Sequence, residues 1–491
     1  MKFRYTFLLI AFSAISTHSF AQYAKDGVRF STAQTGTTSR IKALGNAATS
    51  VGGDMSSISA NPAGLGYFTH SELSITPEFD SYNNNAAYIG QNNSANSNTM
   101  NLSNAGVVFY NQLSNPAGTD RTKGWLSINL GIGYNRTNNY YEKIQYGAKN
   151  NANSINDYYA RLANSQGLTE GSLQAWASDE QLIDAYGSGT NFSYQSNAFP
   201  GVQQAGFISR TGGQSGYDIS AGANYSNKLY VGLGVGISEI RYNTNTSFNE
   251  TGNLSLLTAG VPTPVTRGFN STYSQFQNTK GEGYNVKFGA MYKIIESVRV
   301  GGTITTPTYY TIEDSFNEGL SNNISSGPNY NNGPVEYPLT YNMRTPFKFA
   351  GGLSVFLGNI GFITGDIEHV DYTTTHISSN DDYTSDYDNG LIKANYRAVT
   401  NYHAGAEIKI VDTFFLRGGY GIQGNPLKGG ADTKMVTGGL GYRVGNYYFD
   451  AAYVNVKGSQ NVMQYDIGAT TPSAAVNATN NNFFLTVGLR Y

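Results

Sequence analysis

The sequence predicts an all-β protein, a 14-stranded antiparallel transmembrane β-barrel. Three observations favour this fold. Apolar residues alternate with small or polar ones, connections come in two sizes, and charged residues are scarce. In residues 229–237, every second residue is Leu, Val or Ile, and three of the four residues between them are glycine. Successive side chains of a strand point to opposite faces, so one face of such a strand is apolar and the other is small or polar.

The connections between the alternating stretches are either short or long. Short ones lie near residues 226–228, 294–297, 358–359, 411–412 and 444–446, with a longer one near 115–123. Long ones, rich in Asn, Ser, Gly, Thr and Tyr, lie near 83–102, 141–215, 249–279, 314–342, 377–395, 424–432 and 458–481. Outer-membrane barrels show this asymmetry between their two ends. The predicted strands lie near 70–82, 103–112, 124–140, 216–226, 229–248, 280–293, 297–313, 343–357, 360–376, 395–410, 413–423, 433–444, 446–457 and 482–491.

The composition excludes several classes of function. Charged residues make up 13% of the 491 residues, well below the roughly 25% of an average globular protein. Lys and Arg (31) nearly balance Asp and Glu (33), which gives no electrostatic reason to expect a nucleic-acid partner. Cysteine is absent, which removes disulfides, thiol catalysis, Cys-based metal sites and a lipoprotein anchor.

Residues 1–21 have the features of a secretory signal peptide. Lys2 and Arg4 precede an apolar run at 7–15, and we expect cleavage after Ala21. No later run reaches the roughly 20 apolar residues that a transmembrane helix needs. The mature protein is therefore predicted to be exported and to cross a membrane with strands.

A small, nearly uncharged stretch, residues 40–68, separates the signal peptide from the strands. It is rich in Gly, Ala and Ser and ends in Asn-Pro-Ala-Gly at 61–64. Such a stretch is too short to form its own core and too apolar for a solvated linker, so we expect it to pack inside something larger. The glycines at 232, 234 and 236 empty the inner face of one strand and leave space for such a piece or for a ligand.

This stretch carries the pattern R-A-x-G-x-A-x-x-A, then D, then N-P-A-G-L. The matching residues are Arg40, Ala43, Gly45, Ala47, Asp54, Asn61, Pro62, Ala63, Gly64 and Leu65; Lys42-Ala43-Leu44 departs from the usual run of small residues. In this the sequence resembles the FadL/TodX-type outer-membrane transporters of hydrophobic compounds, the long-chain fatty acid transporter family of Gram-negative bacteria. The resemblance implies an N-terminal hatch (22–68) inside a barrel (69–491), with Arg40, Gly45, Asn61, Pro62, Ala63 and Gly64 as hatch residues.

The resemblance also implies passive transport of hydrophobic or amphipathic molecules such as long-chain fatty acids. A ligand would enter between external loops, the hatch would shift, and the ligand would leave through a kink in an early strand, for which Gly131 and Gly133 are suitable. We expect a monomer in outer-membrane lipid, with no cofactor. The last strand, which ends in Tyr491, resembles the signal that outer-membrane assembly machinery recognises. A general porin and a barrel partner in a secretion or surface complex remain alternatives.

The longest predicted loop, 141–215, contains two predicted helices. One covers 154–164 with Ser154 as N-cap, and the other covers 170–186 after Thr169. Leu173 and Trp176 fall on one face of the second helix. This face either packs the loop into a lid or offers an external capture surface for a hydrophobic ligand.

Several charged residues are predicted to face the lumen. They are Asp218, Lys287, Arg299, Lys348, Glu407, Lys409 and Arg417. Either they pair with each other as a polar wall, or one of Lys287, Arg299, Lys348 and Arg417 binds the carboxylate of a ligand.

Other chemistry has little support. His369 and His376 are an odd number of residues apart, so within one strand they would face opposite sides and could not chelate a metal together. The acidic loop around 381–388 has Arg397 where an EF-hand has its last glutamate, which favours a solvated loop. For these two reasons we predict no metal site. No G-x-S-x-G motif occurs, so we predict that the protein is not an enzyme.

Overall fold

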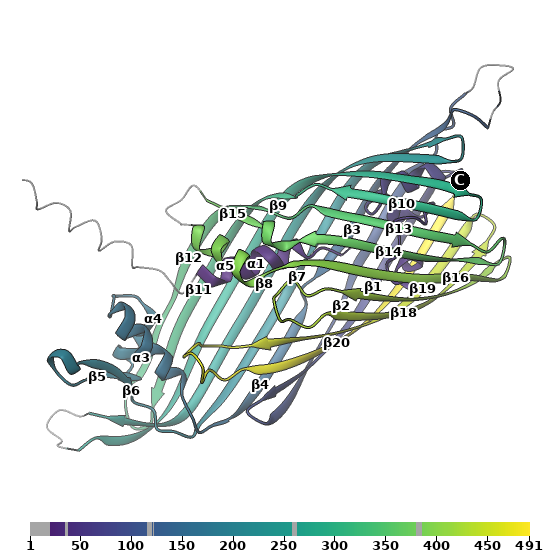
Figure 1. Cartoon of the computed structure of the whole chain (residues 1–491). Helices are drawn as coiled ribbons and strands as arrows, with labels where there is room; N and C mark the ends of the chain where they lie inside the picture. Colours follow the sequence, from purple (N-terminus) through teal and green to yellow (C-terminus); the bar gives the residue numbers. More distant parts are fainter. Residues whose placement is uncertain (1–19, 35–37, 115–119, 121, 258–262, 380–384) are drawn as a thin grey trace, which may run out of the picture.

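The computed structural model describes residues 20–34, 38–114, 120, 122–257, 263–379 and 385–491 (Figure 1). Most of the predicted signal peptide (1–21), and Asp381 and Asp382 of the acidic loop, lie outside the described residues. Strands form one antiparallel sheet that closes where the last strand pairs with the first, with Leu489 opposite Leu73.

The closed sheet has fourteen strands, as predicted, and four of them are interrupted so that each carries two labels. In order they are β1 (Glu72–Tyr88), β2 (Gln91–Phe109), β3 (Trp125–Asn139) with β4 (Glu142–Asn150), β7 (Val202–Tyr225), β8 (Leu229–Leu256), β9 (Val265–Ile295), β10 (Val298–Thr305) with β11 (Tyr309–Ile324), β12 (Asn329–Arg344) with β13 (Lys348–Phe356), β14 (Gly361–Asp371) with β15 (His376–Ser378), β16 (Ala398–Val411), β17 (Phe414–Gln423), β18 (Thr433–Val444), β19 (Tyr447–Val462) and β20 (Ala474–Arg490).

The strands bury polar side chains and expose apolar ones. On β7, Asp218 and Ser220 are each 1% exposed, whereas Ile219 between them is 56% exposed. Soluble proteins show the opposite arrangement, because their apolar side chains avoid water. An outward apolar surface around a polar interior is the arrangement that lipid requires of a barrel. The alternation read from the sequence is therefore confirmed.

The strands are longer than predicted at the long-loop end. Residues 83–102, 249–279 and 314–342, expected as loops, are largely the extensions of β1 and β2, of β8 and β9, and of β11 and β12. Their ladders continue without a regular apolar face: on β8 the outward residues change after Ile237 to Glu239, Arg241 and Asn243. Beyond the lipid the outward face need not be apolar, so periodicity disappears although the backbone pairing persists.

Two of the interruptions contain proline and lie side by side. Pro307 separates β10 from β11, and Pro346 separates β12 from β13. Proline has no N–H to donate to a ladder. The neighbouring threonines bridge the break instead: the Thr308 N–H donates to Thr345 Oγ1 (2.8 Å), and the Thr345 N–H donates to the Thr308 carbonyl (3.0 Å).

Short helices lie at both ends of the barrel lumen and in the long loops. They are α1 (Phe20–Ser31), α2 (Ser39–Ala43), the 3₁₀ turns η1 (Met55–Ile58), η2 (Pro62–Tyr67), η3 (Gly189–Asn191) and η4 (Tyr372–Thr374), and α3 (Ile155–Gln166), α4 (Leu173–Asp179) and α5 (Asp386–Asn395). Within the described part of the chain, no helix is both long enough and apolar enough to cross a membrane. Figure 1 shows α3 and α4 at the end opposite the C-terminus, while the segment that follows α2 lies near the C-terminal end.

The first helix of the long loop is confirmed and the second is shorter than predicted. Ser154 caps α3 in a reciprocal capping box with Asp157. The second helix, α4, is capped by Ser172 and ends at Asp179. Gln181 has a positive φ of 60°, and the chain then forms the small hairpin of β5 (Ile183–Tyr186) and β6 (Ser193–Ser196).

The acidic stretch at 386–388 is helical and partly buried, so its prediction as a solvated loop is wrong. It begins α5, and Asp388 is 0% exposed. Its carboxylate accepts a hydrogen bond from the Ala24 N–H of α1 (2.8 Å). This contact joins two elements far apart in sequence, which periodicity cannot reveal.

Candidate functional site in the barrel lumen

Residues 39–68, which we call the luminal segment, are hydrogen-bonded to strands on several sides of the barrel. The Ser39 N–H donates to Thr486 Oγ1 on β20 (2.9 Å). On β16, His403 Nδ1 lies 2.7 Å from the Gly45 carbonyl oxygen, and on β7, Ser220 Oγ donates to the Ile58 carbonyl (2.6 Å). The luminal segment is therefore bonded to the inner wall at widely separated strands.

Inward-facing glycines let the two backbones meet. A Cβ added at Gly232 of β8 would lie 2.2 Å from the carbonyl carbon of Pro62. A Cβ at Gly301 of β10 would lie 2.3 Å from the Thr49 oxygen, and one at Gly405 of β16 would lie 2.4 Å from the Leu44 oxygen. Real Cβ atoms do not come this close to backbone, so these wall positions need glycine. At Gly236 the nearest atoms belong to Asp218 and Asn285 of the wall instead.

A chain of charges anchors Arg40. Its guanidinium donates to both carboxylate oxygens of Glu407 (2.8 and 3.1 Å). Arg417, whose side chain is 0% exposed, also donates to Glu407 (2.6 Å) and to Asp450 (2.6 Å). Both carboxylates that face Arg417 are thus engaged, and its guanidinium is enclosed. Arg417 fits the paired-wall interpretation and not a ligand contact.

The Asn-Pro-Ala-Gly residues form a compact turn. Asn61 Oδ1 accepts from the Ala63 N–H (3.1 Å), and Asn61 Nδ2 donates to the Thr49 carbonyl (2.6 Å). Pro62 occupies the first turn of η2, where a missing N–H costs nothing. Gly64 packs against Ser57, where a Cβ would lie 2.4 Å from Ser57 Oγ.

The glycine at 45 meets a different requirement. It has a φ of 66°, and a Cβ there would lie 2.8 Å from the Ala404 and Tyr420 oxygens. A left-handed backbone against a wall strand leaves no alternative to glycine. The structure therefore brings the motif residues at 40, 45 and 61–64 to the lumen, each with a defined contact.

The other three predicted cations differ in what they contact. Lys287 pairs with Asp218 (2.5 Å). Arg299 donates to the Val51 carbonyl (3.0 Å), and its guanidinium carbon lies 4.3 Å from the ring centroid of Tyr67. Lys348 donates to the Ala33 carbonyl (3.1 Å), and no described carboxylate lies within ion-pair distance of its Nζ.

A cavity of about 100 Å³, which we call the chamber, lies between the wall and residues 30–34 and 46–60. Polar side chains dominate its lining, including the threonines beside Pro307 and Pro346. Its charged lining residues are Asp218, Lys287, Lys348, Asp366, Glu368 and His403. Pockets for drug-sized ligands are roughly 300–1,000 Å³, so the chamber accommodates a small polar group rather than a whole fatty acid in this conformation.

The barrel wall is not hydrogen-bonded everywhere. β2 pairs with β3 only where residues 104–109 face 130–135. Beyond that, the described residues 91–103 pair with β1 alone, while 136–150 pair with β7 alone. We call the unpaired boundary between 91–103 and 136–150 the seam. Side chains bridge it: Asp80 of β1 accepts from Asn101 (3.0 Å) and from Asn139.

Gly131 and Gly133 lie below the seam, in the paired part of β3. Both face Ile58 of the luminal segment, and a Cβ at Gly131 would lie 2.7 Å from Ile58 Cγ1. The ladder of β3 shifts register further along, between Arg136 and Asn138. The irregularity in this early strand is therefore next to the predicted glycines and not at them.

Residues 151–201, which we call the cap, fold over the long-loop end. Leu173 and Trp176 are 6% and 5% exposed and pack with residues of β8 and β9. This corrects the idea of a capture surface at these two residues, because an accessible groove would leave them exposed. Glu250 of β8, 0% exposed, holds the start of α3 by accepting from Ser154 Oγ and from the Ile155 N–H (3.1 Å).

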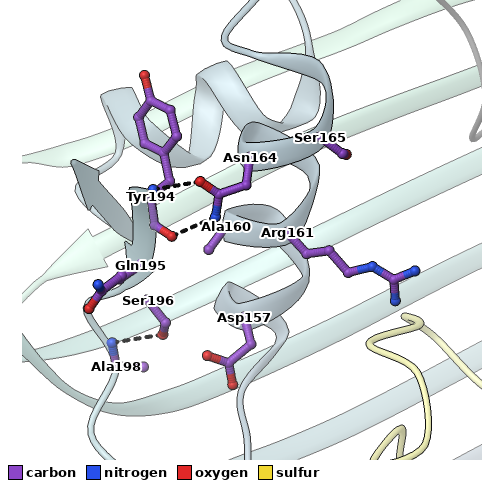
Figure 2. A pocket seen from close by; sticks show the side chains of 9 residues that line it. All are labelled: Asp157, Ala160, Arg161, Asn164, Ser165, Tyr194, Gln195, Ser196 and Ala198. Carbon is purple, nitrogen blue, oxygen red and sulfur yellow. Dashed lines mark hydrogen bonds between the residues drawn. The ribbon is translucent and has the colours of Figure 1, made fainter. Parts of the chain in front are cut away.

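A second buried carboxylate joins the cap to another hairpin. Glu180 is 0% exposed and accepts from Asn332 Nδ2 of β12 (3.0 Å). Burial raises the pKa of the Glu180 carboxyl to about 7. A groove of about 710 Å³ lies on the outside of the cap. Figure 2 shows that Asn164, which lines this groove, is bonded to the backbone of Tyr194, and that Arg161 points away from it. Arg161 donates to the Asp466 carbonyl, in the loop after β19 (3.0 Å).

Some residues of the site were missed by sequence reasoning. Asp366 and Asp450 follow the same alternation that identified Glu407 and could have been found by it. Asn46 and Glu250 could not, because their roles depend on contacts between segments far apart in the sequence. His369 and His376 are both exposed, and within the described residues no cluster of His, Asp and Glu could hold a metal ion.

Comparison with solved structures identifies the fold. The toluene transporter TodX of Pseudomonas putida superposes with a TM-score of 0.51 at 13% identity, covering 94% of this chain and 99% of that one. A FadL homologue of Pseudomonas aeruginosa gives a TM-score of 0.52 at 12% identity, covering 93% and 99%. No family model and no curated protein sequence matches this chain. At these identities the likeness concerns the fold: this chain has the barrel fold of those two proteins over nearly its whole length.

Proposed function

We propose that this chain is a passive outer-membrane transporter of hydrophobic or amphipathic small molecules, with long-chain fatty acids as the first substrates to test. One observation supports this most: the luminal segment is bonded to the wall on several sides, whereas the seam leaves the side wall unpaired. The luminal segment obstructs a straight path through the barrel, whereas a sideways path through the seam crosses no backbone hydrogen bonds between strands. The names of the two similar structures, a toluene transporter and a FadL homologue, point to the same class of cargo.

In this proposal the luminal segment is a hatch. Arg40, Gly45 and the turn at 61–64 hold it against the wall. When it shifts, Ile58 withdraws from Gly131 and Gly133, and β3 gains room to bend next to the seam. A ligand that has entered under the cap then leaves through the seam into the membrane. Lys348, whose Nζ has no carboxylate within ion-pair distance among the described residues, meets the polar end of the ligand.

Uptake by cells tests this function. The protein is expressed in a Gram-negative host that lacks its own fatty-acid channel, and uptake of radiolabelled oleate is compared with uptake of a small hydrophilic sugar. We expect oleate uptake above that of cells with an empty vector, and no gain for the sugar. A gain for the sugar would indicate a general porin. No gain for either, with a stoichiometric protein partner after mild detergent extraction, would indicate a secretion or surface role.

A further inference from the structure

Lys42 is a buried cation of the luminal segment, at a position where the family pattern has small residues. It is 8% exposed, and no carboxylate of the described residues lies within ion-pair distance of its Nζ. The Nζ atom lies 5.2 Å from the ring centroid of Phe484 on β20. The next residue is fixed to the wall, because Thr437 Oγ1 donates to the Ala43 carbonyl (2.8 Å). A buried cation without a close partner is costly, so its place in the lumen needs an explanation.

The position over Phe484 brings Lys42 beside two acidic residues of β1. Phe484 lies directly opposite Glu78 in the ladder of β1 and β20, and its side chain also faces the lumen. Glu78 and Asp80 are two residues apart on the same face of β1, and they are 7% and 3% exposed. The Cβ atoms of opposite residues are about 5 Å apart, so the ammonium group acts on both carboxyl groups.

Asp80 is the residue that bridges the seam. Its Oδ2 atom accepts from Asn101 of β2 (3.0 Å) and from Asn139 of β3, which lie on the two sides of the seam. The other carboxylate oxygen of Asp80 is buried without a partner. Because no backbone ladder joins the two sides here, the bridge depends on one carboxylate oxygen.

The strength of this bridge depends on the charge of Asp80. Two neighbouring buried carboxyl groups do not both stay ionised unless a cation is near. Hydrogen bonds to an ionised carboxylate are roughly twice as strong as bonds between neutral groups. Arg136 also acts on Glu78, but it belongs to β3. Lys42 is carried by the luminal segment, so its distance from Asp80 changes whenever that segment shifts.

We infer that Lys42 is a positioning residue that couples the luminal segment to the seam. While the segment is bonded to the wall, the charge of Lys42 keeps Asp80 on Asn101 and Asn139. When the segment shifts, the bridge weakens and the seam opens. This inference rests on the proposed transport function and identifies the contact through which the hatch controls the sideways exit. Coupling is reciprocal, so a closed seam also favours the bonded position of the segment.

The distance across the seam tests this inference in the full-length protein in lipid nanodiscs. Spin labels are attached to Asn98→Cys and Gln145→Cys, two exposed positions on opposite sides of the seam in a chain without native cysteine, and dipolar EPR spectroscopy measures their separation. We expect Lys42→Met to add a population with the labels about 5 Å farther apart, the spacing of one strand. Lys42→Arg keeps the charge and should retain the native separation.

A second substitution separates the effect of charge from that of packing. Glu78→Gln leaves Asp80 as the one acid of the pair, so Asp80 stays ionised without Lys42. We expect Glu78→Gln to restore the native separation in the Lys42→Met protein. Glu72→Gln is the matched control: Glu72 also faces the lumen from β1 and is 8% exposed, but it pairs with Arg490 (2.9 Å). It should not restore the separation.

The outcomes separate this inference from the transport function. A native separation in Lys42→Met, or an increase that Glu78→Gln does not reverse, would overturn the coupling and leave transport standing. Absence of oleate uptake by the native protein, together with the expected changes in separation, would overturn transport and support the coupling.

Discussion

The Arg40 guanidinium and the Glu407 carboxylate are joined by two hydrogen bonds, of 2.8 and 3.1 Å, that connect the luminal segment to β16. Glu407 also accepts from Arg417, which in turn binds Asp450. Of these four linked charged residues, Arg40 is the one that belongs to the luminal segment; Glu407, Arg417 and Asp450 belong to the wall. Removal of Arg40 takes away this anchor of the segment, whereas Glu407 keeps its bond to Arg417, so the wall carboxylate retains a partner.

We therefore expect Arg40→Ala to make the barrel leaky while leaving its strands folded. Breaking a buried ion pair costs about 3–5 kcal/mol at most, and the partner that Glu407 retains lowers that cost. Planar-bilayer recording should show larger and more frequent openings. Arg241→Ala is the control, because its pair with Glu239 is exposed. A closed Arg40→Ala channel would show that this pair does not hold the segment.

Glycine substitutions test how closely the segment approaches the wall. At Gly232 a Cβ would lie 2.2 Å from Pro62, whereas at Gly438, on the outer face of β18, the nearest atom is 4.0 Å away. We expect Gly232→Ala to displace the 61–64 turn and raise its protease susceptibility, and Gly438→Ala to have no effect. Limited proteolysis with mass spectrometry measures this. Equal cleavage of both variants would contradict the packing described.

Much of this architecture is predictable from sequence, and the limits have physical causes. Outward Leu, Val and Ile reveal the strands wherever lipid demands an apolar face, which is why all fourteen were found. The extensions of β1, β8 and β11 need no apolar outward face, so their sequences resemble polar loops. The motif at 61–64 indicated an internal segment. Whether each lysine or arginine is paired depends on partners from other strands, such as Asp450, and no local sequence pattern encodes these partners.

The seam was beyond prediction for the same reason. Strand β2 is a continuous Asn- and Ser-rich ladder against β1, and nothing in residues 91–103 indicates that the other edge is unpaired. The predicted glycines of β3 lie next to the break because they accommodate Ile58. Pairing is a relation between two strands, and periodicity describes one strand at a time.

The closed cap should be more stable in acid than in base. The pKa of Glu180 is raised to about 7 from its ordinary 4.5, so the closed cap binds this proton more tightly than an open one. The stabilisation is present below pH 4.5 and is lost as the pH rises through 7. Hydrogen exchange of α3 and α4, corrected for intrinsic rates, should be slower at pH 5 than at pH 8. Glu180→Gln should reduce this difference; an unchanged difference would assign it to another group.

Closing the seam should stop export into the membrane. Asn101 and Asn139 face each other across it through Asp80, and the chain has no native cysteine. We expect a short bifunctional thiol reagent to abolish oleate uptake by Asn101→Cys/Asn139→Cys. Asn455→Cys/Asn481→Cys, on the paired strands β19 and β20, is the matched control and should keep its uptake. Full uptake by the cross-linked seam variant would exclude this exit.

The most direct test of the account locks the luminal segment to the wall. Ser50 Oγ and Ser354 Oγ lie 2.7 Å apart. Asn455 and Asn481, both on wall strands, face each other, with Asn455 Nδ2 2.7 Å from Asn481 Oδ1. We would measure oleate uptake by Ser50→Cys/Ser354→Cys under oxidation and after reduction, with Asn455→Cys/Asn481→Cys as the control. The account predicts that oxidation blocks uptake only in the first variant and that reduction restores it. Undiminished uptake with the disulfide formed would contradict a mobile hatch.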